Sequence, residues 1–277
     1  MSSPNNADQI AYWNGDAGAR WVAQQARLDA MLSPISDAAL KAANVQHGEH
    51  ILDIGCGCGD TSIKFGKLGA RVTGADISAP MLGVAKRRTN EANATATFIE
   101  ADAATHKFDS NSFDLLFSRF GVMFFADPDA AFANMRKALK PTGRAAFVCW
   151  RDWRENEWVR VPIMAVRPHV PPQPQMGPED PGPFAFADPA RVRRILANGG
   201  FDAITLNPFD TKVEIGNTLD DAVTYLMEFG PISRALTDAS PSQREQATNA
   251  LRDALAPHAK AAPITLGAAV WIVTAKA

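Results

Sequence analysis

Residues 51–61 read Ile-Leu-Asp-Ile-Gly-Cys-Gly-Cys-Gly-Asp-Thr, a short apolar stretch that runs into three glycines at alternate positions. Glycine has no Cβ atom, so its backbone can adopt positive φ and can lie close to a ligand. The pattern predicts a buried strand, a tight loop and then a helix. In α/β folds, a loop of this kind at the carboxyl end of a strand is a common ligand site.

The spacing of the glycines restricts the class of ligand that the loop can bind. A dinucleotide-binding loop requires G-x-G-x-x-G, whereas here the third glycine comes one residue early and Asp60 occupies the expected position. A phosphate loop of the G-x-x-x-x-G-K-[ST] type is absent. Asp53 and Asp60 would repel a pyrophosphate, and they suit a ligand that carries an ammonium and a sulfonium.

Strand and helix patterns alternate along the rest of the chain. This alternation predicts a parallel sheet covered by helices on both faces. The predicted strands are 51–54, 71–75, 96–100, 113–118, 144–149, 201–206 and 268–274. The predicted helices after the glycine loop are 61–68, 80–93, 128–139, 190–198, 219–236 and 241–256, with one more ending near residue 166.

The chain divides into four predicted parts. Residues 1–45 are expected to be helices that cover the cofactor site, with Ser33-Pro34 starting a new helix. Residues 46–150 are expected to form the cofactor-binding α/β core. Residues 151–187 form an aromatic and proline-rich lid insert, and residues 188–277 complete the core and carry a helical insert at about 217–262.

Composition argues against several classes of protein. The chain has 28 Lys and Arg against 30 Asp and Glu, a formal net charge of −2, and no basic stripe, so we expect no nucleic-acid partner. No apolar run approaches the roughly 20 residues that span a bilayer, so we expect no membrane insertion. Three cysteines and a polar start favour a cytoplasmic protein. Cys56-x-Cys58 lacks the further ligands of a zinc site, so we expect packing cysteines and no metal.

Residues 51–61 resemble the first motif of class I S-adenosylmethionine-dependent methyltransferases, closest to the branch of ubiquinone and menaquinone biosynthesis enzymes. Further landmarks follow in order at 72–78, 98–103, 113–120 and 139–144, where Thr142 replaces a usual glycine. The resemblance implies a Rossmann-like, seven-stranded, mostly parallel sheet with helices on both faces and a helical lid over the strand carboxyl ends. It also implies an enzyme with S-adenosylmethionine as cofactor.

The resemblance assigns roles to individual residues. Asp76 would accept the ribose hydroxyls, Asp102 would meet the adenine amino group, and the Ala103 N–H would complete the adenine edge. Ser118, Arg119 and Met123 would lie near the sulfonium or the adenine. The full set expected at the cofactor is Asp53, Gly55, Cys56, Gly57, Gly59, Thr61, Asp76, Ile77, Met81, Ala101, Asp102, Ala103, Ser118, Arg119, Met123 and Trp21.

The expected acceptor is a small, apolar or aromatic molecule, because the inserts are rich in aromatic residues and no basic surface is visible. The residues expected to contact it are Tyr12, Trp150, Asn156, Trp158 and Phe229. No catalytic dyad is visible, so we expect catalysis by positioning; His169, Tyr12 and Arg119 are the candidate catalytic residues. A catalytically silent cofactor-binding subunit and an NAD(P)-dependent oxidoreductase are the alternatives, and the lid helices could instead form a homodimer surface.

Overall fold

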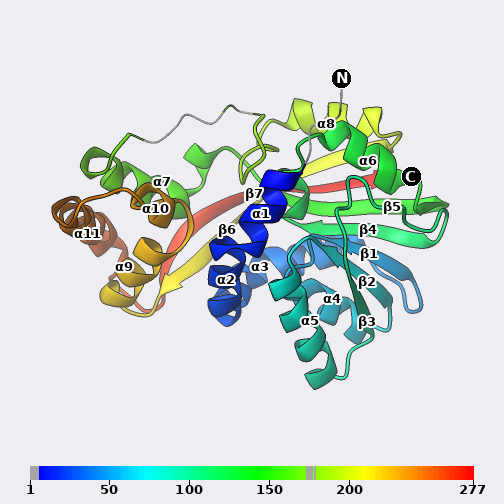
Figure 1. Ribbon diagram of the computed structural model, residues 1–277, viewed down its shortest axis with the longest axis horizontal. Helices are drawn as coiled ribbons and strands as arrows, with labels where there is room; N and C mark the ends of the chain where they lie inside the picture. Colours follow the sequence, from blue (N-terminus) through cyan, green and yellow to red (C-terminus); the bar gives the residue numbers. More distant parts are fainter. Residues whose placement is uncertain (1–5, 173–176, 178) are drawn as a thin grey trace.

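The computed structural model describes residues 6–172, 177 and 179–277, and it contains a seven-stranded sheet (Figure 1). The strand order is β3-β2-β1-β4-β5-β7-β6. Strands β1 to β5 are parallel, and β7 runs antiparallel to both of its neighbours. The prediction of a mostly parallel sheet is confirmed. The strands are β1 His50–Ile54, β2 Arg71–Asp76, β3 Ala96–Glu100, β4 Phe113–Arg119, β5 Leu139–Trp150, β6 Asp202–Gly216 and β7 Ile264–Lys276.

Helices cover both faces of the sheet, as the alternating pattern predicts. Helices α3, α4 and α5 pack along one face, and α6 and α8 pack together on the other (Figure 1). The α-helices are α1 Ala7–Asn14, α2 Asp16–Ala23, α3 Gln25–Ala43, α4 Asp60–Lys67, α5 Ala79–Glu91, α6 Pro128–Arg136, α7 Glu157–Val166, α8 Pro189–Asn198, α9 Leu219–Glu228, α10 Gly230–Ala235 and α11 Pro241–Leu255. Four single-turn 3-10 helices, η1 Gly121–Phe124, η2 Trp153–Glu155, η3 Arg167–His169 and η4 Ala256–His258, complete the described elements.

The first helices differ from the prediction at Pro34. Ser33-Pro34 does not start a helix, because α3 continues through it from Gln25 to Ala43. A proline inside a helix removes one backbone hydrogen bond. Burial outweighs this loss, since Leu32, Ile35 and Ala39 of the same helix are at most 4% exposed. The helix therefore keeps one continuous apolar face against the sheet.

The second half of the sheet is longer than the sequence pattern indicates. β6 and β7 pair antiparallel over most of their length, from Asp202↔Lys276 to Gly216↔Ile264. β5 starts at Leu139, and the predicted Pro-Thr-Gly turn forms a bulge within it, between Phe113↔Leu139 and Arg144↔Leu115. β6 is an edge strand whose residues are mostly exposed or half-buried, which is why only a short apolar part of it is predicted.

The chain between β6 and β7 forms a helical insert beside the carboxyl ends of the parallel strands. The predicted helix 219–236 is divided into α9 and α10 at Phe229 and Gly230, where Gly230 has a φ of 76°. α11 packs on α7 and α9, so the insert and the segment after β5 form one group of helices, on the left in Figure 1. The predicted proline-rich segment 168–183 lies partly outside the described residues, at 173–176 and 178.

One hydrophobic core joins the sheet and the insert. Leu52, Phe117 and Val148 of the sheet and Leu251 and Leu255 of α11 belong to a single cluster of buried residues. Within the described part of the chain, no helix is long and apolar enough to cross a membrane.

Candidate functional site

The three glycines after β1 all have positive φ, as the sequence pattern predicts: 63° at Gly55, 53° at Gly57 and 81° at Gly59. Gly55 lies against the loop after β4, where an added Cβ would come within 2.7 Å of the Gly121 Cα. Gly59 packs against Ala85 and Phe98 on the far side. Two of the glycines therefore let the loop pack against its neighbours.

Gly57 is the glycine with an open side. A Cβ built there would meet only the Met81 Sδ at 3.8 Å and the Trp21 Nε1 at 4.0 Å. The Gly57 N–H donates to the Asp76 Oδ2 at 2.8 Å, which fixes the loop to the end of β2. A Cβ at Gly57 would thus make only ordinary van der Waals contacts, and we call this side of the loop, bounded by the Met81 thioether and the Trp21 indole, its open side.

Asp76 lies at the carboxyl end of β2 and is 7% exposed. Its Oδ1 accepts the Ser78 N–H at 2.8 Å, while its Oδ2 accepts the N–H of Gly57. Burial raises the pKa of Asp76, and the backbone donors from Ser78, Gly57 and Ile77 oppose that rise. Each carboxylate oxygen has a second lone pair, so the group can still accept from a ligand.

Asp102 follows β3 and is half-buried. Its Oδ1 accepts the Ala104 N–H at 3.0 Å and the Nδ2 amide of Asn6 at 3.2 Å. Ala101 and Ala103 beside it are buried. The ends of β1, β2 and β3 therefore bring Gly57, Asp76 and Asp102 to one edge of the sheet, the arrangement the sequence predicts.

Asp53 lies beneath the glycine loop and is fully buried, so it supports the loop and does not face the open side of Gly57. Its Oδ2 accepts the hydroxyl hydrogens of Thr61 at 2.8 Å and Ser62 at 2.6 Å. Its Oδ1 is buried without a partner among the described residues. Burial raises the pKa of Asp53 to about 6, against hydrogen bonds that lower it. The geometry thus conflicts with the prediction that Asp53 and Thr61 contact a ligand. The two residues instead hold the loop in place.

The Asp53→Asn variant is expected to change how stability depends on pH. The folded wild type keeps the Asp53 proton up to about pH 6, whereas the carboxyl of the unfolded chain loses it near its ordinary pKa of 3.8. The free energy of unfolding therefore falls as pH rises from about 4 to about 6, and the loss persists above that range. Asparagine accepts the same two hydroxyls without charge. We expect Asp53→Asn to exceed wild type by about 2–3 kcal/mol at pH 8 and by almost nothing at pH 4.

Urea unfolding of the two proteins at both pH values tests this expectation. Comparing wild type with the variant cancels the titration of every other group. The same difference in stability at pH 4 and pH 8 would show that Asp53 does not titrate between them.

Ser118 and Arg119 end β4, and both are engaged within the protein. The Ser118 hydroxyl donates to the Ile54 carbonyl at 2.8 Å and accepts the Gly121 N–H at 3.1 Å. Arg119 donates to the Asp60 Oδ2 and the Ser36 Oγ, both at 2.9 Å, and is 10% exposed. Ser118 therefore joins two loops. The ion pair with Asp60 neutralises the charge of Arg119, so this charge would not repel a cationic ligand.

A second arginine reinforces the glycine loop from the side of α5. Arg88 donates to the Cys58 carbonyl at 2.7 Å and to the Asp29 Oδ2 of α3 at 2.6 Å. Charge-assisted hydrogen bonds of this kind are stronger than neutral ones. The loop is thus anchored to α3, α4 and α5.

The two loop cysteines are buried and pack in apolar surroundings. Cys56 packs with Leu82, Ala85 and Phe98, and Cys58 packs with Met81 and Val84. Burial raises the pKa of Cys58 to about 12 and holds the pKa of Cys56 well above its ordinary value. Both are neutral thiols, and the described residues contain no group of three His, Cys, Asp or Glu that could hold a metal ion.

Aromatic side chains from both ends of the chain meet above the loop. Trp21 of α2 contacts Trp13 of α1 at 6.0 Å between ring centroids and Phe229 at 5.9 Å, and Phe229 stacks on Tyr225 of α9. We call Trp13, Trp21, Tyr225 and Phe229 the aromatic lid. Figure 1 shows α1 and α2, in blue, between the insert and β1–β3.

Tyr12 joins the two halves of this lid. Its hydroxyl accepts a hydrogen bond from Arg234 of α10 at 2.6 Å, and the guanidinium lies 5.1 Å from the ring centroid. Tyr12 is 38% exposed, so it lies on the outer side of the lid. Its hydroxyl links α1 to the insert, which is a closing contact and not a catalytic one.

Trp150 and Trp158 lie together at the end of β5 and in the segment that follows it. Every polar atom of Asn156 in the same segment is already hydrogen-bonded within the protein. Trp150 stacks on Phe120 at 4.3 Å and lies 4.8 Å from Trp158. The Asn156 Nδ2 donates to the carbonyls of Arg151, Asp152 and Ala269, while its Oδ1 accepts from the Ala269 N–H and the Trp158 Nε1. With no exposed surface and every polar group engaged, Asn156 has none left for an acceptor. The prediction that it contacts the acceptor conflicts with this geometry.

The Asn156→Ala variant is expected to lose about 3–5 kcal/mol of unfolding free energy, because it leaves several buried backbone groups without partners. Arg154→Ala, in the same segment and 69% exposed at its side chain, should change stability by less than about 0.5 kcal/mol. Urea denaturation measures both. If Asn156→Ala reduced methyl transfer at unchanged stability, the result would show that Asn156 contacts the acceptor.

His169 is not brought to the glycine loop. It lies in η3, which packs against α11 in the insert. The structure thus gives none of His169, Tyr12 and Arg119 a position that favours a catalytic role. Sequence reasoning also missed Asn6 and Asn14, which bind the ends of β3 and β2 from α1. An asparagine that precedes a predicted helix is expected to cap that helix. The contact of Asn6 with the end of β3 is therefore not expected from the sequence.

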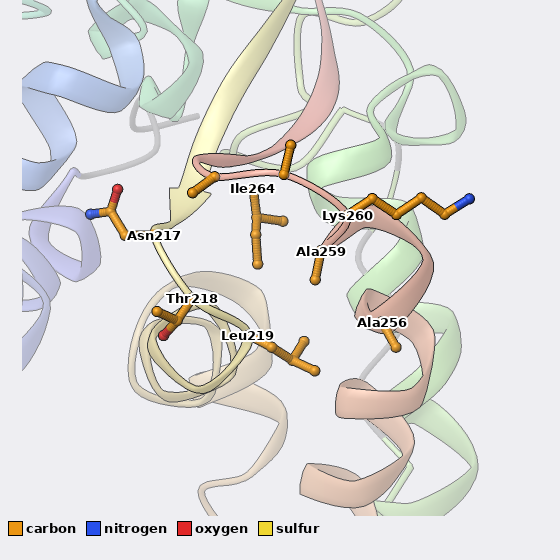
Figure 2. Close-up of a pocket in the computed structure, with 9 residues that line it drawn as sticks. Asn217, Thr218, Leu219, Ala256, Ala259, Lys260 and Ile264 are labelled. Carbon is orange, nitrogen blue, oxygen red and sulfur yellow. The ribbon is translucent and has the colours of Figure 1, made fainter.

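A cavity of about 560 Å³ lies elsewhere, in the insert (Figure 2). Asn217, Thr218 and Leu219 line it from the start of α9, and Ala256, Ala259, Lys260 and Ile264 line it from the chain between α11 and β7. It includes no residue of the predicted site. The insert thus has a hollow of its own, separate from the glycine loop.

Comparisons with known proteins agree with this geometry. Residues 51–143 match the family described as Methyltransferase domain. The chain is 36% identical over 98 residues to a demethylmenaquinone methyltransferase of Thermus thermophilus. The aligned region covers 35% of this chain and 44% of that protein. It is 26% identical over 169 residues to an uncharacterized protein of Mycobacterium tuberculosis, covering 61% of this chain and 60% of that protein.

A solved structure shares the fold over the whole chain. A phosphoethanolamine N-methyltransferase 2 of Haemonchus contortus, in complex with S-adenosylhomocysteine and phosphomonomethylethanolamine, aligns with a TM-score of 0.55 at 19% identity, covering 100% of this chain and 60% of that one. The chain shares its fold with a methyltransferase of known structure, and its residues 51–143 match the Methyltransferase domain family. It spans less than two thirds of the length of the curated relatives just described.

Proposed function

We propose that this protein is an S-adenosylmethionine-dependent methyltransferase that acts on a small, apolar or aromatic acceptor. The observation that carries the proposal is the open side of Gly57. This side of the loop is bounded by the end of β2, the Met81 side chain and the Trp21 indole. The methyltransferase relatives and the shared fold support it.

The described residues fit the cofactor at three points. The backbone beside Gly57 has room for the methionine part, Asp76 can accept from the ribose hydroxyls, and Asp102 with the Ala103 N–H can bind the adenine edge. Buried amide oxygens of Asn6 and Gln9 have no partner among the described residues, as expected where a ligand supplies donors. When bound, S-adenosylmethionine supplies an electrophilic methyl group on a sulfonium.

The contribution of the protein is to orient the acceptor and exclude water. The Trp21 indole lies beside Gly57 through its Nε1, and the Phe229 ring contacts this indole; such aromatic groups can contact an apolar acceptor and attract a cationic sulfonium. The ion pair of Arg119 with Asp60 keeps a competing positive charge neutralised nearby. Within the described site no side chain is placed as a general base, so in-line displacement depends on alignment.

The aromatic lid and the charge balance favour a small acceptor over a macromolecule. The hydrogen bond between Tyr12 of α1 and Arg234 of α10 joins the first helices to the insert, which favours an enclosed site over an open face for a folded RNA or protein. A net charge of −2 offers no electrostatic attraction for nucleic acid.

Transfer of labelled methyl groups from S-adenosylmethionine to a panel of quinols, phenols, small amines, tRNA and bulk protein tests the acceptor class. We expect turnover with at least one small aromatic acceptor and none with tRNA or protein. Methylation of a macromolecule alone would refute the acceptor class while retaining the methyltransferase.

A further inference from the structure

Helix α1 is fixed at both ends to the two strand ends that carry Asp76 and Asp102. At its C-terminal end, the Asn14 Nδ2 donates to the Ile77 carbonyl at 2.8 Å, and the Asn14 Oδ1 accepts the Ala79 N–H at 3.0 Å. At its N-terminal end, Asn6 donates to Asp102 at 3.2 Å. The helix therefore spans the ends of β2 and β3, above the place proposed for the adenosine.

Asn6 occupies the N-cap position of α1 but does not cap the helix. Asparagine is among the preferred N-cap residues because its side-chain oxygen accepts a backbone N–H of the first turn. Here no such bond forms; the side chain instead reaches Asp102 and the residue is 9% exposed. The helix thus forgoes about 1 kcal/mol of capping, while the amide is held over the end of β3.

The bond to Asp102 fixes which way the Asn6 amide points. The Nδ2 donates to the Asp102 Oδ1, whereas a flipped amide would place two oxygens against each other. The Oδ1 consequently faces away from Asp102. It is buried and has no hydrogen-bond partner in the part of the chain that the structure describes.

Gln9 repeats this feature one turn later. Its Oε1 is also buried without a partner among the described residues. Residues three apart lie on the same face of a helix, so the two amide oxygens belong to one face of α1. A buried acceptor without a donor costs about 1–3 kcal/mol, and a ligand with N–H groups would remove that cost.

We infer that Asn6 and Gln9 bind the adenine amino group of the cofactor from the lid, on the side opposite Asp102; the inference rests on the proposed function. The exocyclic amino group carries two N–H donors, which suits acceptors on two sides. Hypoxanthine has a carbonyl oxygen at that position and would meet the amide oxygens with lone pairs. α1 thereby acts as a cover that selects adenine.

The test compares binding of S-adenosylhomocysteine with binding of S-inosylhomocysteine, in which a carbonyl oxygen replaces the amino group and the adjacent ring nitrogen N1 carries a hydrogen; because every variant meets the same change at N1, the difference in preference between variants reports on Asn6 and Gln9. Calorimetric titrations use wild type, the double variant Asn6→Ala/Gln9→Ala and the matched control Asp8→Ala, whose residue is exposed on the same helix. Wild type and control should prefer the adenosyl ligand by at least tenfold. The double variant should lose about tenfold of that preference, mainly through weaker binding of the adenosyl ligand.

The outcomes separate the two proposals. An unchanged preference in the double variant, with normal binding by wild type, would overturn the inference and leave the proposed function intact. Absence of binding of either ligand to wild type would overturn both. Thermal unfolding without ligand provides a second measurement. Because Asn6 and Gln9 leave acceptors unsatisfied, the double variant should melt no more than a few degrees below wild type, so weaker binding cannot be ascribed to unfolding.

Discussion

Substituting Gly57 with alanine should lower the affinity for S-adenosylhomocysteine by about 100-fold or more while the protein stays folded. The new methyl group would project into the open side of the loop, where nothing in the protein lies closer than 3.8 Å. The clash is therefore with the ligand alone. The backbone φ of 53° adds a folding cost of about 1–2 kcal/mol, which a domain of this size tolerates.

Gly48→Ala is the matched control for Gly57→Ala. Gly48 also has positive φ, 85°, and a Cβ there would meet nothing within 4 Å, but it precedes β1 at the opposite end of that strand. The two variants should lose similar stability, and only Gly57→Ala should lose affinity. Equal affinity in both, measured by calorimetry, would show that the cofactor does not lie beside Gly57.

The Asp76→Ala variant should weaken binding of S-adenosylhomocysteine by about 100-fold or more. A carboxylate that accepts two ribose hydroxyls contributes about 1.5–3 kcal/mol for each charged hydrogen bond. The substitution also removes the acceptor of the Gly57 and Ser78 N–H groups, so the loop loses its fixed curvature. Both effects act on the same ligand.

Asp114→Ala controls for the general loss of a carboxylate at a strand. Asp114 accepts the His50 N–H at 2.9 Å and pairs with Lys140 at 2.7 Å at the amino end of the sheet. It should reduce stability and leave affinity unchanged. If both aspartate variants bound the ligand as wild type does, Asp76 would have no part in the site.

Local patterns sufficed to predict the sheet and the residues at the ends of β1, β2 and β3. Gly57, Asp76 and Asp102 each follow an apolar strand, and parallel strands end at a common edge, so their meeting follows from the sequence. Strand lengths were predicted poorly for β6 and β7, where antiparallel pairing of the two strands extends past the apolar residues.

The roles of single polar side chains could not be predicted, because they depend on contacts distant in sequence. Asn156 lies among tryptophans, which suggested an acceptor pocket, yet it binds the backbone of Ala269 on β7. Asn6 meets Asp102 across 96 positions. Ser118 sits at a strand end typical of ligand contacts, but its hydroxyl joins two loops. Residue type and spacing identify candidates, and only the packing shows which polar groups are already engaged.

The measurement that tests the account most directly is calorimetric titration of the wild-type protein with S-adenosylhomocysteine and, separately, with NADH. The account predicts saturable binding of S-adenosylhomocysteine in the micromolar range with one site per chain, and no binding of NADH. Binding of NADH alone, or of neither ligand, would contradict the assignment of the glycine loop and with it the proposed methyltransferase function.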